Sequence, residues 1–138
     1  MSVLSIKDKD VGTEDVPASF FLHSLQGAGN MKMIKAVVRP EKSDVILTKL
    51  CENGYRAATR FSILGRGKQR GLKVDNVYYD EISKEVLMIV VRDEDVDKVT
   101  DIIIKNARSG SEGSFGDGKI FILPVESVYT ISSGKKDL

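Results

Sequence analysis

Residues 61–71 read Phe-Ser-Ile-Leu-Gly-Arg-Gly-Lys-Gln-Arg-Gly, an apolar run that leads directly into a turn of glycines and cations. The turn, residues 65–71, contains three glycines, three cations and one amide. Glycine permits positive φ and lets a ligand approach backbone N–H groups closely, and cations beside such a turn suit phosphate. The stretch therefore predicts the end of a strand next to a site for an anionic ligand.

A second glycine cluster lies far along the chain. Residues 113–119 read Gly-Ser-Phe-Gly-Asp-Gly-Lys and run straight into the apolar sequence Ile-Phe-Ile-Leu. Two glycine-rich, lysine-bearing turns beside two strands predict a nucleotide held between them, although either turn alone has the composition of an ordinary solvated loop. The G-x-x-x-x-G-K spacing is that of a phosphate-binding P-loop, but Ile120 stands where a metal-binding Ser or Thr is required and a strand follows instead of a helix. The P-loop NTPase class is excluded.

Composition limits the function classes further. The chain has 138 residues, enough for one domain with a modest core. Lys plus Arg is 21 and Asp plus Glu is 20, a balance that argues against a nucleic-acid binder. The single cysteine, Cys51, permits no internal disulfide and fits a reducing, cytoplasmic setting. No apolar run approaches the ~18 residues of a membrane span, so no membrane insertion is expected.

Neither catalysis nor a metal site built from histidines or cysteines is expected. His23, the only histidine, has no partners for a metal site, and the body of the chain shows no paired acid and base and no nucleophile constellation. Cys51 falls on the apolar side of a predicted helix and is expected to be a core residue. The sequence therefore predicts a binding or regulatory protein and no enzyme.

Residues 1–30 differ from the rest and are predicted to be an N-terminal extension or leader. Charged residues punctuate the first half, and Phe20 and Phe21 belong to a short apolar patch. A leader, an unstructured arm and a segment that docks the Phe pair on the body all remain open. The domain proper is expected at residues 31–138.

The regular elements follow from periodicity and from stop signals. Strands are predicted at 31–38, 55–64, 86–91 and 119–123, with a further edge strand within 125–131 and a polar tail after it. A helix is predicted at 41–53, with Val45, Ile46, Leu47 and Leu50 on its buried face. A second helix is expected to be capped by Asp93 and to end before Gly110, with Val96, Val99, Ile103 and Ala107 facing the core. Residues 66–84 form a long connection, which in a compact domain is usually functional.

The order strand, helix, strand, long loop, strand, helix, strand is the βαββαβ ferredoxin-like pattern of an α+β fold. Both helices then cover one face of the sheet. Phe61, Ile63 and the apolar strand 86–91 argue that the other face is buried by a partner, so an oligomer is expected.

At this point residues 31–131 resemble the PII signal-transduction family. The resemblance rests on residues 31–40 (Met-Lys-Met-Ile-Lys-Ala-Val-Val-Arg-Pro), 65–71 (Gly-Arg-Gly-Lys-Gln-Arg-Gly) and 116–121 (Gly-Asp-Gly-Lys-Ile-Phe). It implies a homotrimer that binds ATP or ADP in clefts between subunits, with 2-oxoglutarate as effector beside Mg-ATP. Loop 66–84 would be the T-loop that reaches a target. This loop is short, as in the branch of the family that regulates nitrogenase. The implied target is nitrogenase or an ammonium transporter.

The resemblance also implies roles for individual residues. The nucleotide-binding residues would be Thr59, Gly65, Gly67, Lys68, Gln69, Gly116, Asp117, Gly118 and Lys119. Gln69 would also help to hold Mg2+ and, together with Gly71 and Lys84, would bind 2-oxoglutarate.

Two departures from the family pattern are visible. Thr130 and Ser132 stand where the family has two arginines that reach the phosphates across the subunit boundary, and loop 109–118 is longer and carries Glu112. Losing two cations that face a triphosphate should weaken binding, since charge-assisted bonds to phosphate are strong. The alternative function is therefore a divergent PII-like trimer whose site takes another nucleotide or anion, or none.

Overall fold

The computed structural model describes residues 31–66, 73–74, 77–78 and 81–137. Residues 31–125 form one compact unit, and the chain beyond them is described by itself. In chain order the compact unit contains β1 (Met31–Val38), α3 (Pro40–Glu52), β2 (Ala58–Gly65), β3 (Lys73–Val74), β4 (Val77–Tyr78), β5 (Ile82–Arg92), the 3-10 helix η2 (Asp93–Asp95), α4 (Val96–Ala107) and β6 (Gly118–Pro124).

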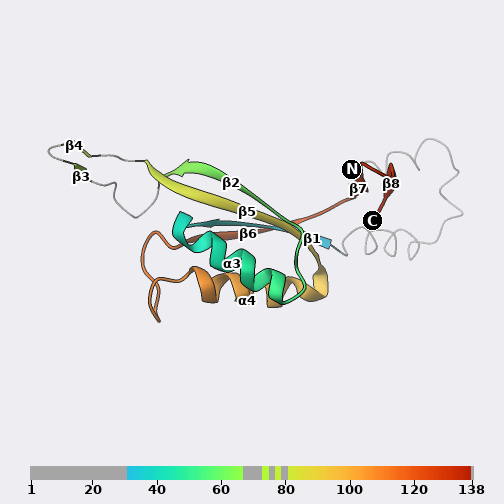
Figure 1. Cartoon of the computed structure of the whole chain (residues 1–138), viewed down its shortest axis with the longest axis horizontal. Coiled ribbons are helices and arrows are strands. Elements are labelled where there is room, and N and C mark those ends of the chain that lie inside the picture. The colour runs from blue at the N-terminus through green and yellow to red at the C-terminus, as the bar shows by residue number, and fades with distance from the viewer. Residues whose placement is uncertain (1–30, 67–72, 75–76, 79–80, 138) are drawn as a thin grey trace, which may run out of the picture. The chain divides into compact units, whose positions relative to one another are not determined.

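The main sheet has the strand order β2-β5-β1-β6, and every neighbouring pair is antiparallel. Both helices lie on the same side of this sheet (Figure 1). This is the predicted ferredoxin-like arrangement, in which β1 and β5 are central and β2 and β6 are the edges. The predicted α+β fold class is confirmed.

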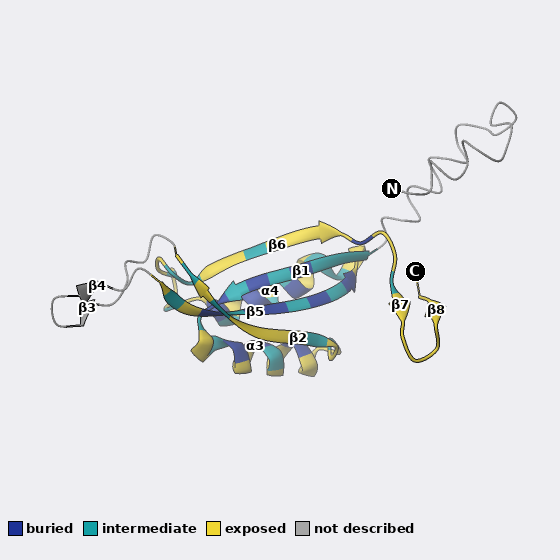
Figure 2. Ribbon diagram, turned by 90° about the horizontal axis from the view of Figure 1, so that it is seen from above, coloured by how far each residue is buried: buried dark blue, intermediate teal, exposed yellow. Residues whose placement is uncertain are grey.

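The core lies between the sheet and the two helices. Successive strand residues point to opposite faces, so alternate residues of β1 and β5 face the helices. Figure 2 shows this core as dark blue on the two central strands, whereas the edge strands are mostly exposed. The buried cluster consists of Ile34, Ala36, Val38, Ile46, Leu50, Leu87, Ile89, Val91, Val99, Ile103 and Ala107.

Helix α3 begins at Pro40, whose fixed φ and missing N–H suit the first helical position. Ser43, Ile46 and Leu50 are its buried residues. The prediction of Cys51 as a core residue is wrong, because this thiol is exposed. Each helical residue turns about 100° from its predecessor, so Cys51 follows the buried Leu50 but turns away from the core. Val45, also predicted as buried, is 39% exposed.

Asp93 does not cap the second helix. Residues 93–95 form η2, α4 begins at Val96, and neither element has a side-chain cap hydrogen bond. The Asp93 carboxylate instead accepts a hydrogen bond from Lys32 Nζ at 2.7 Å. The predicted apolar stripe holds, since Val99, Ile103 and Ala107 are the buried residues of α4.

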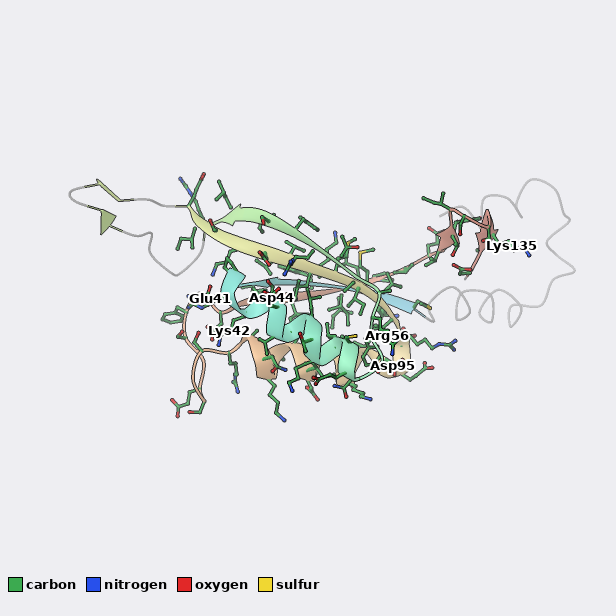
Figure 3. The ribbon with its side chains drawn as sticks, viewed as in Figure 1. Glu41, Lys42, Asp44, Arg56, Asp95 and Lys135 are labelled. Atoms are coloured by element: carbon green, nitrogen blue, oxygen red, sulfur yellow. The ribbon has the colours of Figure 1, made fainter. Side chains whose placement is uncertain are left out.

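Two strand boundaries differ from the sequence prediction. β2 begins at Ala58, and Tyr55 instead packs beside the core while its hydroxyl donates to Asp95 at 3.0 Å. Figure 3 labels Asp95 near the C-terminal end of α3. β5 begins at Ile82, four residues before the predicted strand, and β3 pairs with β4 within the long connection.

The sheet face opposite the helices is apolar and partly open. Phe61 and Val86 are register partners on this face, as are Lys35 and Phe121. Phe61 is 45% exposed and Phe121 51% exposed. Large apolar side chains at such exposure, gathered on one face, are typical of a surface that a partner covers.

The predicted edge strand and polar tail form a hairpin. β7 (Tyr129–Thr130) pairs antiparallel with β8 (Lys135–Lys136), and Gly134 in the turn adopts positive φ. The polar tail therefore contributes the second strand of a separate two-stranded sheet. The Thr130 hydroxyl hydrogen bonds to the Asp137 carboxylate.

Candidate ligand-binding pocket

A pocket of about 550 Å3 lies where β2 ends and β5 begins. Its lining combines the start of the long loop, the end of that loop and the second glycine cluster. The residues are Val37, Gly65, Arg66, Ile82, Lys84, Ser114, Phe115, Gly116, Asp117, Gly118, Lys119 and Phe121. The first two residues of the 65–71 turn, Gly65 and Arg66, therefore lie beside the second glycine cluster.

Both ends of the long loop reach this pocket. Gly65 and Ile82 are register partners in the β2–β5 ladder, and both line the pocket. The pocket therefore lies beside the residues from which the loop departs and to which it returns.

Asp117 organises the second wall. Its carboxylate accepts hydrogen bonds from Ser109 N at 3.0 Å, Ser109 Oγ at 2.6 Å and Ser114 N at 2.8 Å. Burial raises the pKa of Asp117, but the hydrogen bonds from Ser109, Ser114 and Arg39 lower it by more, so the pKa lies well below its usual range. Asp117 thus remains a carboxylate that holds the loop in shape.

Arg39 is a pocket-supporting residue that sequence reasoning did not single out. Its Nε donates to Asp117 Oδ1 at 3.1 Å, and its Nη2 donates to the Phe115 carbonyl oxygen at 2.9 Å. The guanidinium therefore offsets the Asp117 charge and fixes the wall. The sequence shows that Arg39 lies directly before Pro40, the first residue of a helix. Nothing in the sequence indicated that Arg39 pairs with Asp117.

Lys84 joins the loop end to this wall. Its side chain is buried, and Nζ donates to the Gly116 carbonyl oxygen. Burial, followed by repulsion from Arg39, lowers the pKa of Lys84, while Glu41 and Asp117 partly offset that effect. A buried ammonium at the pocket edge is well suited to receive a carboxylate or phosphate.

Gly118 brings the second glycine cluster against β1. It has φ of 116°, and a Cβ at this position would lie 1.7 Å from the Val37 carbonyl oxygen. Only glycine fits there. The next residue, Lys119, pairs with Val37 in the β1–β6 ladder and is exposed at the pocket.

The predicted site residues fall into three groups. Gly65, Lys84, Gly116, Asp117, Gly118 and Lys119 line the pocket. Thr59 is an exposed residue of β2, six residues before Gly65, and does not line it. Gly67, Lys68, Gln69 and Gly71 lie outside the described residues.

Glu112 does not line this pocket itself. It lines an adjoining groove beside α4 and β6, and the groove and the pocket share Ser114, Asp117 and Lys119 among their lining residues. The effect of its charge on a bound anion stays a prediction. Among the residues that the structure describes, no group of three acidic, histidine or cysteine side chains is placed to hold a metal ion.

The fold and pocket define a ferredoxin-like ligand-binding module whose site joins both ends of one long loop. The chain matches the family model described as nitrogen regulatory protein P-II over residues 31–135, and it belongs to that family.

Curated relatives agree with this assignment. The chain is 50% identical over 101 residues to nitrogen fixation nifHD region glnB-like protein 1 of Methanococcus maripaludis, covering 73% of this chain and 93% of the relative. It is 51% identical over 105 residues to the protein of the same description from Methanothermococcus thermolithotrophicus, covering 76% and 97%. These relatives place the chain in the nitrogenase-associated branch, as predicted.

A solved structure supports the fold. The crystal structure of Arabidopsis thaliana PII bound to citrate matches with a TM-score of 0.64 and 30% identity, covering 78% of this chain and 86% of that one. The chain is thus a nitrogen regulatory signal-transduction protein of a family that binds small-molecule effectors and whose GlnB-like members are not enzymes. No helix among the described residues is long and apolar enough to cross a membrane.

Proposed function

We propose that this chain senses adenine nucleotide and 2-oxoglutarate, and that loop 66–84 reports the bound state to a protein target. The observation that carries this proposal is the pocket that Gly65, Lys84 and the 114–119 wall share. A ligand shifts a conformational equilibrium only if it binds one state more tightly. Contacts with both ends of the loop would supply such a difference wherever two loop states place these ends differently.

The pocket chemistry suits a nucleotide polyphosphate. Lys84 and Lys119 supply cations, and Gly116 and Gly118 let phosphate oxygens approach the backbone. Gly67, Lys68 and Gln69 are proposed to complete the phosphate site, since they continue the chain from Arg66. Because the described residues offer no carboxylate cluster for a metal, Mg2+ is proposed to be held by the ATP phosphates and by Gln69.

The effector fits the same end of the pocket. A dicarboxylate such as 2-oxoglutarate needs a cation and backbone donors, and Lys84 provides the cation. Gln69 and Gly71 are proposed as the further contacts. The related Arabidopsis thaliana PII structure is bound to citrate, another polycarboxylate, which is in keeping with a carboxylate ligand for this chain.

A homotrimer is proposed to complete the site. The apolar face that includes Phe61 and Phe121 would be buried between subunits. Thr59 lies on the same face of β2 as Phe61, since residues two apart share a face. Its proposed adenine contact would therefore lie on the face that the trimer is proposed to bury.

The proposed target is nitrogenase or an ammonium transporter in the cytoplasm. The names of the relatives refer to the nifHD region of nitrogen fixation, which favours nitrogenase.

A second candidate function is supported by the C-terminal hairpin. The hydroxyl of Thr130 is hydrogen bonded to Asp137, so a carboxylate lies at a position where the family has an arginine. A divergent trimer that takes another nucleotide or anion, or none, would tolerate this change.

Calorimetric binding of ATP to the Lys119→Ala variant tests the proposed function. The variant should lose nucleotide binding and keep the wild-type oligomeric state. Lys105→Ala is the matched control, because Lys105 is an exposed lysine in the last turn of α4, outside the pocket. Equal ATP affinity in the two variants would refute the proposed site.

A further inference from the structure

The groove beside α4 and β6 has a volume of about 840 Å3 and an apolar wall. Both elements contribute to this wall, which consists of Ile103, Ile104, Ile120 and Ile122. Ile104 is 42% exposed and Ile122 is 46% exposed, so part of the wall is open to solvent. A cavity of this size with a mainly apolar lining is typical of a small-molecule site.

The apolar wall lies on the helix side of the sheet. Ile120 and Ile122 pair with β1 residues that belong to the buried core between the sheet and the helices. Phe121 lies between them in β6 and points to the opposite face, where the homotrimer is proposed to form. The proposed trimer interface therefore leaves this wall uncovered.

Side chains of opposite charge line the same groove. Arg108 follows the last residue of α4, and Glu112 lies four positions further along the chain. Both are exposed, and neither side chain makes a hydrogen bond or ion pair with another residue in the described part of the chain. The Asp117 carboxylate is already engaged in the hydrogen bonds of the pocket wall. The groove thus presents a cation and an anion beside its apolar wall.

We propose that this groove binds an α-amino acid with a large apolar side chain. Arg108 receives the carboxylate, Glu112 receives the ammonium group, and the isoleucine wall packs against the side chain. A purely apolar ligand would leave both charges unused, and a simple anion would be repelled by Glu112. A zwitterion with an apolar body matches all three features. This inference goes beyond the proposed function and does not depend on it.

The test is titration of the full chain with L-leucine, followed by two-dimensional NMR of the backbone amides and the isoleucine methyl groups. Leucine should shift the signals of Ile104, Ile120 and Ile122 and leave the signal of Phe61, on the other face of the sheet, unchanged. L-Alanine carries the same two charges on a smaller side chain. It should bind about tenfold more weakly, because it buries less apolar surface.

Two leucine analogues and two variants assign the charges. 4-Methylpentanoate is leucine without its amino group, and 3-methylbutylamine is leucine without its carboxylate. The wild-type protein should bind each about tenfold more weakly than leucine, because each lacks one charge-assisted contact. Arg108→Gln should bind leucine no better than 3-methylbutylamine, and Glu112→Gln should bind it no better than 4-methylpentanoate. The controls Lys105→Gln and Asp101→Asn remove exposed charges of α4 outside the groove and should bind leucine like wild type.

Two results would overturn this inference. One is equal affinity of the wild-type protein for leucine and both analogues. The other is a leucine titration that leaves the groove signals unchanged, including the case in which these signals broaden with rising protein concentration because a second copy covers the groove. Neither result bears on the proposed function, which is tested by ATP binding to the separate Lys84 pocket.

Discussion

Substituting Asp117 by Asn should unfold the pocket wall at a large cost in stability. The carboxylate accepts two hydrogen bonds from Ser109 and two from Ser114, and Arg39 Nε donates a further one at 3.1 Å. An amide keeps one acceptor oxygen but turns an NH2 group toward these donors. Loss of charge-assisted bonds at a side chain that is only 16% exposed should lower the free energy of unfolding by about 3 kcal/mol.

Asp44→Asn is the control for this prediction. Asp44 also pairs with an arginine, at 2.5 Å from Arg60 Nη1, but its side chain is 90% exposed. An exposed ion pair contributes at most about 1 kcal/mol. In urea denaturation, Asp117→Asn should therefore lose much more free energy of unfolding than Asp44→Asn. Equal losses would refute the claim that the Asp117 hydrogen bonds stabilise the fold more than a surface ion pair does.

The pH dependence gives an independent check on Asp117. Its folded pKa lies below the unfolded value of about 3.9, so the unfolded state binds more protons as the pH falls. The stability that Asp117 contributes is full above about pH 5 and is lost as the pH falls through the unfolded pKa toward the folded one. The difference between wild type and Asp117→Asn should shrink below about pH 4. A difference that does not change with pH would contradict the assigned hydrogen bonds.

Three further predictions follow from other parts of the chain. Gly118→Ala should lower the free energy of unfolding in urea by several kcal/mol, because the added Cβ would clash with the Val37 carbonyl oxygen. Gly110→Ala is the control: this glycine also has positive φ but open space around it, so the loss should be only about 1–2 kcal/mol. Similar losses in the two variants would contradict the close approach of Gly118 to β1. Phe121→Glu should dissociate the proposed oligomer into a smaller species in sedimentation velocity, while the circular dichroism spectrum stays native because Phe121 is half exposed in the single chain. An unchanged oligomer would exclude this face as the interface. Gln69→Ala should spare ADP binding and lose 2-oxoglutarate binding in calorimetry, and equal binding of the acid would remove Gln69 from the site.

The fold was predictable from the sequence because its signals are local. Alternation in residues 31–38 and the apolar stripe of Val99, Ile103 and Ala107 each specify one element and its buried face. Boundaries were less predictable where tertiary contacts decide them. Asp93 is a residue type that often caps helices, yet its carboxylate accepts a hydrogen bond from Lys32, which is far away in the sequence.

The pocket was predictable in outline and not in detail. The two glycine and lysine clusters predicted a site between residues 65–71 and 113–119, and described residues of both stretches do line one pocket. The pairing of Arg39 with Asp117 was not predictable, because residues 78 positions apart are brought together only by the β1–β6 register. The pairing of Thr130 with Lys135 was also not predictable, because the sequence identified residues 134–138 only as a polar tail.

The central claim is that the pocket at the two ends of loop 66–84 senses nucleotide and 2-oxoglutarate together. The most direct measurement is calorimetric titration of the full chain with ATP and Mg2+, with and without 2-oxoglutarate. We predict that ATP binds and that the acid tightens its binding, because both ligands are proposed to bind against Lys84 and the 114–119 wall of one pocket. ATP affinity that is unchanged by 2-oxoglutarate, or an absence of ATP binding, would contradict it.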